Sequence, residues 1–134
     1  MSKLSAFLNP APLGEEKEVV ISDRFRDENG EVVPFRIRAL SQEETDAITK
    51  QATRRVTVNG TKQEQLDSAA FSRLMVLAAT VEPNFAATEV CQAYGVLDPG
   101  QVPGKMLRAG EYARLLKEIT ALSGFADVED EVKN

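Results

Sequence analysis

Carboxylates are the side chains of this sequence most able to do chemistry, and some occur in adjacent pairs. Glu43 and Glu44 stand at the start of a helical pattern, and Asp130 and Glu131 lie near the C-terminal end. Carboxylates act as general acids or bases where a dry cleft shifts their pKa values. Acids at a helix start simply favour the positive end of its dipole, and acids near a chain end are solvated. We therefore interpret both pairs as structural, and "DENGE" (27–31) lacks the spacing of a calcium-binding loop.

The chain contains one cysteine, Cys91, and no histidine. This composition removes Ser-His-Asp and Cys-His arrangements and zinc sites built from thiolates. The sequence has neither a Walker-type phosphate-binding motif nor a GxGxxG motif. Cys91 lies in the apolar string "TEVCQAYG" and is interpreted as a small buried hydrophobe rather than a reactive thiol. We expect no enzyme activity, no cofactor and no metal site.

The formal net charge is -5, from 16 Lys and Arg against 21 Asp and Glu. A nucleic-acid-binding face needs clustered cations, so this balance argues against a nucleic-acid partner. The first ten residues lack the apolar region of a signal peptide. The longest apolar stretch, residues 74–81, falls short of the about 20 residues that span a bilayer. We expect no membrane association and a location in the cytoplasm.

An apolar segment at the N-terminus is the first candidate contact with another protein. Leu4, Phe7 and Leu8 share one helical face, and "NPAPLG" after them is typical of a linker. The favoured interpretation is that Phe7 and Leu8 fold back onto the core, because exposed apolar groups are costly in water. The alternative is a docking segment for another chain.

The second candidate contact lies in "KMLRAGEY", between two helical patterns. It comprises Met106 and Leu107 together with Tyr112. The favoured interpretation is that Met106 and Leu107 fill the core where the chain crosses it. The alternative is an adaptable apolar contact with a partner, for which flexible methionine is well suited.

Two stretches of alternating or β-branched residues predict an antiparallel hairpin near the N-terminus. In "VPFRIRA" the residues Val33, Phe35, Ile37 and Ala39 share one face, and "EVVISDRF" precedes it. Between the two lies Asn-Gly, which tolerates the positive φ of tight turns. Because Pro34 cannot donate a ladder hydrogen bond, we expect this strand either at a sheet edge or paired on one side only at Pro34.

The helical patterns carry their own start and stop signals. Ser41 and Glu44 form a capping box for a helix over 41–54, and Asp67 caps an apolar helix that ends before Pro83. Shorter helical patterns follow before Gly95, and a last helix runs from Gly110 to Gly124. The piece around Asn59-Gly60 is either a flexible loop or a small hairpin. The apolar helix over 68–81 would suit either a monomer core or a ring of subunits, so the oligomeric state is left open.

These elements predict an α+β fold: an N-terminal antiparallel β-hairpin followed by about four α-helices in a single domain. We divide the chain into an apolar segment and linker (1–14), an α+β domain (15–125) and an acidic tail (126–134).

The order of motifs resembles a known family. The series runs "LSAFL", "VVISDRFRDENGEVVPFRIRALSQEE", "RRVTVNG", "FSRLMVLAATVEPNF" and "YGVLDPGQVPGKMLRAGEYARLLKEITALSGF". It is similar to the tail assembly chaperones of tailed phages and PBSX-type defective prophages, over nearly the whole chain. The shared motifs are structural rather than catalytic.

The resemblance implies a role in tail morphogenesis in the cytoplasm of the bacterial host. Such proteins bind the long tape measure protein, help to recruit tail tube subunits and are absent from the finished virion. The alternative is a small structural tail protein, such as a tube or connector component. The resemblance supplies no binding residues, so the candidate contacts remain the six apolar residues named above.

Overall fold

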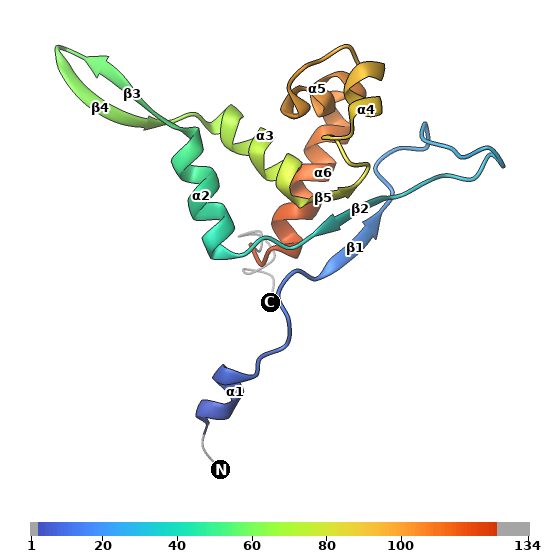
Figure 1. Ribbon diagram of the computed structural model, residues 1–134, viewed down its shortest axis with the longest axis horizontal. Coiled ribbons are helices and arrows are strands. Elements are labelled where there is room, and N and C mark those ends of the chain that lie inside the picture. Colours follow the sequence, from blue (N-terminus) through green and yellow to red (C-terminus); the bar gives the residue numbers. More distant parts are fainter. Residues whose placement is uncertain (1–2, 126–134) are drawn as a thin grey trace.

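The computed structural model describes residues 3–125, so the acidic tail over 126–134 lies outside the described residues. The elements alternate between helices and short strands, in agreement with the predicted α+β class (Figure 1). In chain order they are α1 (Leu4–Leu8), β1 (Glu16–Val19), β2 (Phe35–Arg38), α2 (Gln42–Ala52), β3 (Thr53–Val58), β4 (Thr61–Leu66), α3 (Ser68–Ala79), β5 (Thr80–Glu82), α4 (Thr88–Ala93), the 3-10 turn η1 (Pro99–Gln101), α5 (Val102–Met106) and α6 (Ala109–Leu122).

The predicted N-terminal hairpin is present, and β2 is the centre of a three-stranded antiparallel sheet. The strand order is β1-β2-β5, with Glu16 opposite Arg38 and Val19 opposite Phe35. Of the two alternatives predicted for this strand, the position at a sheet edge was therefore wrong. Pro34 precedes the first paired residue, so its missing N–H removes no bond from the ladder.

The predicted alternation in β2 is confirmed at its centre. Phe35 and Ile37 are buried, whereas Arg36 and Arg38 are half-exposed. The strands are shorter than the sequence patterns, and Val33 lies outside them and is exposed. A tight turn follows Asp27, whose N–H donates to Glu31 O at 2.9 Å, and Gly30 takes the expected positive φ of 78°.

Helix α2 starts as its sequence predicts. The Ser41 Oγ accepts the Glu44 N–H at 3.2 Å, and the Glu44 Oε1 accepts the Ser41 N–H at 3.1 Å. The same carboxylate accepts hydrogen bonds from both terminal nitrogens of Arg38, with Nη2 2.5 Å from Oε2. The cap therefore also ties α2 to the central strand.

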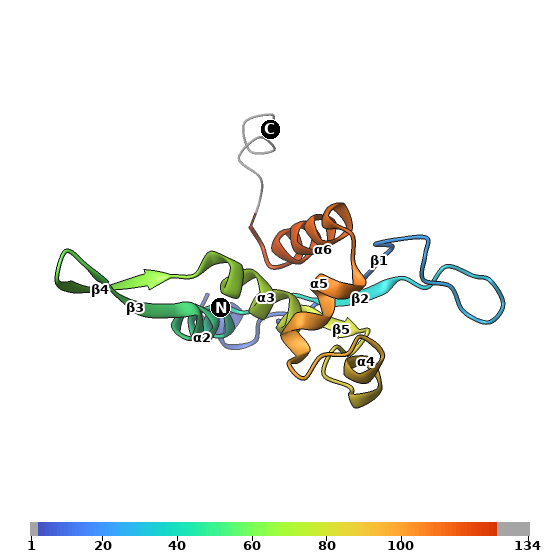
Figure 2. The same ribbon diagram turned by 90° about the horizontal axis from the view of Figure 1, so that it is seen from above.

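The Asn59-Gly60 segment forms a hairpin, which resolves the choice left open by the sequence. Strands β3 and β4 pair from Thr53 opposite Leu66 to Val58 opposite Thr61, and the two turn residues have φ of 52° and 78°. Two residues with positive φ are what a type I′ turn needs. The hairpin projects from the body at one end of the molecule, and its side chains are mostly exposed (Figures 1 and 2).

Helices α3 and α6 form the core with the sheet. Phe85, Ile37, Leu115, Ile119 and Val76 are among the side chains that are fully buried. Helix α3 packs against both α2 and α6, so it takes part in the core of the single chain, which is one of the two places that its apolar sequence suits (Figure 2). Asp67 caps α3, with the Ala70 N–H donating to its carboxylate at 3.1 Å. None of the helices within residues 3–125 is long and apolar enough to cross a membrane.

Candidate partner-binding surfaces

The N-terminal segment lies away from the core. Helix α1 has no buried residue, and the exposed fractions of Leu4, Phe7 and Leu8 are 59%, 78% and 67%. Leu13, in the linker after it, is 83% exposed. The favoured interpretation that Phe7 and Leu8 fold back onto the core was therefore wrong. The linker contains Pro10 and Pro12, which hold the chain extended and away from the sheet (Figure 1).

Met106 and Leu107 lie in the core, as their favoured interpretation states. Each is 9% exposed, and both belong to the cluster around Val76 and Leu115. The glycine- and proline-containing segment "LDPGQVPGKM" (97–106), whose composition is typical of turns, is largely helical, because η1 and α5 follow each other directly. Tyr112 is half-buried, and this burial raises the pKa of its hydroxyl. The structure thus brings Leu107 and Tyr112 together on one depression, places Met106 on another, and leaves all three apart from α1.

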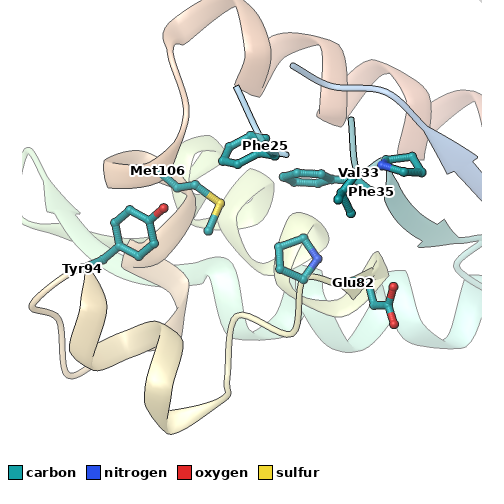
Figure 3. A pocket seen from close by; sticks show the side chains of 8 residues that line it. Phe25, Val33, Phe35, Glu82, Tyr94 and Met106 are labelled. Atoms are coloured by element: carbon teal, nitrogen blue, oxygen red, sulfur yellow. The ribbon is translucent and has the colours of Figure 1, made fainter. Parts of the chain in front are cut away.

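Met106 lines an apolar pocket of about 290 Å³ at the end of the three-stranded sheet. Phe25 and Phe35 lie beside each other with ring centroids 5.5 Å apart, and Tyr94 and Met106 face them (Figure 3). The Glu82 carboxylate points away from the pocket in the same view. The remaining lining residues are Val33, Pro34 and Pro83. This pocket could take one apolar side chain of a partner.

Leu107 and Tyr112 line a different and larger depression, of about 1010 Å³, between α3, α5 and the start of α6. Arg73 and Lys105 also line it, so it is polar at its rim. A third depression, of about 340 Å³, runs between α2, α3 and α6. Phe71, Met75 and Leu116 give it an apolar floor. Both depressions combine apolar side chains with a few polar ones, a composition shared by protein-binding surfaces and ligand-binding clefts.

An ion pair that spans most of the sequence fixes the aromatic pocket. The Arg24 guanidinium donates to Glu111 at 2.6 Å and to the Met106 carbonyl at 2.9 Å, and it lies 5.0 Å from the Phe25 ring centroid. Together with hydrogen bonds from Ser22 and Arg108, this contact lowers the pKa of Glu111 to about 2. Sequence reasoning missed both residues, because no local pattern connects positions this far apart.

The lone cysteine has a structural environment. The Cys91 Sγ lies 3.3 Å from the Phe85 carbonyl, as a weak donor, and the side chain packs against the core while remaining half-buried. This agrees with its interpretation as a small hydrophobe. Among residues 3–125, no group of three or more His, Cys, Asp or Glu side chains is arranged to hold a metal ion.

Comparisons with known proteins converge on one family. The family model described as phage XkdN-like tail assembly chaperone protein matches residues 4–134. Two relatives from Bacillus subtilis (strain 168) align over 126 residues, which is 90% of this chain and 85% of each relative. They are the protein YqbN, 39% identical, and the phage-like element PBSX protein XkdN, 34% identical. The crystal structure of the protein YqbN superposes with a TM-score of 0.78 at 34% identity, covering 94% of this chain and 99% of that chain.

Proposed function

Because the chain belongs to the XkdN-like family of phage tail assembly chaperones, we propose that it binds the phage tape measure protein and helps to recruit tail tube subunits to it. The proposed role is binding without catalysis, in the cytoplasm of the bacterial host. The proposal also holds that the protein leaves the tail before the virion is complete.

The exposed apolar face of α1 is the observation that carries this proposal. A long, largely helical partner presents apolar stripes that aggregate unless they are covered. Phe7 and Leu8 can be covered by such a stripe without any change in the core, since they contact little of their own domain. Helix-in-groove contact of this kind uses a few apolar anchors at helical spacing. The net charge of -5 keeps the remaining surface hydrated and repels other copies of the complex.

Co-expression with the tape measure protein of the same phage tests the proposal. The expected result is a soluble complex that co-purifies, with tail tube protein joining when all three are expressed. The double variant Phe7→Ser, Leu8→Ser should lose the complex. The matched control is Leu97→Ser, which changes a fully exposed leucine in the α4–η1 connection and should retain it.

Two results would contradict the proposal. One is a tape measure protein that stays insoluble with the wild-type chain, with normal tails formed by a phage that lacks the gene. The other is detection of this chain in purified virions by mass spectrometry, which would instead favour a structural tube or connector protein.

A further inference from the structure

Among the described residues each sheet has two open outer edges, those of β1 and β5 in the larger sheet and those of β3 and β4 in the hairpin, and the β1 and β3 edges lie toward opposite ends of the molecule. Within residues 3–125, β1 pairs only with β2, and β3 pairs only with β4. Both views show the β3–β4 hairpin toward one end and β1 toward the other (Figures 1 and 2). An open edge presents unpaired N–H and C=O groups to any second strand. A hairpin that packs only on itself is also marginally stable in water, so it gains from an additional strand.

The alternation of hydrogen bonds along β1 shows which of its residues turn their backbone N–H and C=O groups toward the open edge. The Ala39 N–H donates to Glu15 O at 2.8 Å, so this pair exchanges hydrogen bonds across β1 and β2. Hydrogen-bonded and non-hydrogen-bonded pairs alternate along an antiparallel ladder. Lys17 and Val19 therefore bond inward to β2. The N–H and C=O groups of Glu16 and Glu18 point outward.

The same argument applies to β3. The Asp67 N–H donates to Ala52 O at 2.8 Å, so this pair is hydrogen-bonded. The pairing of β3 with β4 continues from there to the turn without a change of register. Arg54 and Val56 therefore bond inward to β4. The backbone groups of Arg55 and Thr57 point outward on the open edge.

The β1 and β3 edges carry opposite net charges, with Arg54 3.6 Å from Asp67 and Arg55 opposite Glu64 in its own hairpin. Lys50, Arg54 and Arg55 gather with Glu64 around a surface depression of about 260 Å³ at the base of the hairpin. Among the described residues, Lys50 and Arg55 form no ion pair within 4.0 Å, and neither do Glu15 and Glu18 on the other edge. Glu16 lies 3.8 Å from Arg36, but Arg36 is held more closely by Glu82, at 2.7 Å.

We propose that the β3 edge of one copy pairs antiparallel with the β1 edge of a second copy, with Arg55 opposite Glu18. This register also sets Val56 opposite Lys17 and Thr57 opposite Glu16, so that outward backbone groups meet in hydrogen-bonded pairs. A shift by two residues in one direction keeps this hydrogen-bond pattern but sets Arg54 opposite Lys17, a like-charge pair that offsets the attraction between Arg55 and Glu16. The same shift in the other direction sets Arg55 opposite Val20 and loses the attractive pair with Glu18. The charges thus favour the proposed register.

The charges also select the symmetry of the assembly. Pairing β1 with β1 brings Glu16 and Glu18 of the two copies together, and pairing β3 with β3 brings arginines together. Only unlike edges attract each other, so the contact is head-to-tail. A head-to-tail contact between identical chains closes into a ring or continues as an open chain. This self-association does not require the tape measure protein, so its test is independent of the proposed function.

Light scattering of the purified chain over a range of concentrations tests the inference. The mass of the wild-type protein should rise with concentration until a ring closes or a chain grows. Thr57→Pro removes an outward N–H from the β3 edge and no bond of the hairpin, so it should abolish the rise. Glu64→Pro is the matched control, because it removes an outward N–H from the β4 edge and should leave association intact. Circular dichroism should show both variants folded.

Charge removal tests the register. Arg55→Gln and Glu18→Gln each remove one charge of the proposed pair without setting like charges opposite Glu64 or Arg36, and each should weaken association severalfold. The double variant should be no weaker than either single variant, because the first change has already removed the interaction. A wild-type mass that stays at one chain at every concentration overturns the inference. Equal loss in Thr57→Pro and Glu64→Pro, or additive losses in the double glutamine variant, overturns the assigned edge.

Discussion

Replacing Glu44 by glutamine should destabilise the fold at neutral pH and leave it almost unchanged in acid. Two hydrogen bonds from Arg38 and one from the Ser41 N–H hold the pKa of Glu44 at about 2, below its ordinary value of 4.5. That difference corresponds to about 3 kcal/mol. Because 36% of the side chain is exposed, solvent screening reduces the contribution to about 1–2 kcal/mol. Glutamine keeps one oxygen that can accept the Ser41 N–H, but it loses the charge and the second oxygen, which accepts from Arg38 Nη2.

The direction of the pH dependence follows from the lowered pKa. Glu44 is ionised in both the folded and the unfolded chain above about pH 5, so its full stabilisation is present there. As the pH falls toward 2, the unfolded chain binds the proton first and the stabilisation disappears. The difference between wild type and Glu44→Gln should therefore be about 1–2 kcal/mol at pH 7, which is about 3–8 °C in Tm, and should shrink between pH 5 and pH 2.

Urea denaturation followed by circular dichroism at several pH values measures this difference. Glu43→Gln is the control, because Glu43 lies in the same first turn of α2 without a hydrogen bond to Arg38. Its effect at pH 7 should be a few tenths of a kcal/mol. A double-mutant cycle with Arg38→Gln should assign most of the loss to the pair. Equal effects of the two glutamine variants, or a loss that persists at pH 2, would refute the reasoning.

Three further outcomes follow from other contacts. Phe85→Ala should lower the free energy of unfolding by about 3–5 kcal/mol in urea titrations, because the ring is fully buried and lies 6.4 Å from Phe35 between centroids. Gly60→Val should speed amide hydrogen exchange in β3 and β4 while leaving the Tm of the domain nearly unchanged, since Gly60 has a φ of 78° and the hairpin lies outside the core. Glu111→Gln should speed amide hydrogen exchange in residues 20–34 above pH 5, where Glu111 of the wild type is fully ionised. The difference in exchange between variant and wild type should fade as the pH falls toward 2, the lowered pKa of Glu111.

Local signals predicted the elements that depend on local chemistry. Ser41 with Glu44, Asp67 and Gly124 marked helix ends because each acts within one turn of its own helix. The alternation of Phe35 and Ile37 marked the buried face of β2 for the same reason. The family, too, was recognisable from the series of motifs, and the comparisons confirm it.

Pairing between distant segments was not predictable. The central place of β2 depends on β5, whose three residues follow the apolar helix α3 and carry no strand signal of their own. The exposure of Phe7 depends on the linker holding α1 away from the domain, which composition alone does not decide. The aromatic pocket depends on the ion pair between Arg24 and Glu111, which are 87 positions apart in the sequence. The binding of Leu4, Phe7, Leu8, Met106, Leu107 and Tyr112 to a partner stays a prediction.

Contacts between the first strands and the last helix of the domain have a consequence for biosynthesis. Lys17 pairs with Glu118 at 3.1 Å, 101 positions along the chain, and the Leu40 N–H donates to the Ser123 hydroxyl at 3.0 Å. A nascent chain still lacking α6 leaves the core side of Ile37 and Val76 uncovered, so the domain closes only after α6 has been translated. Until then the uncovered core residues should make the nascent chain prone to aggregate, and the abundance of the protein in the cell should respond to translation speed and to host folding factors.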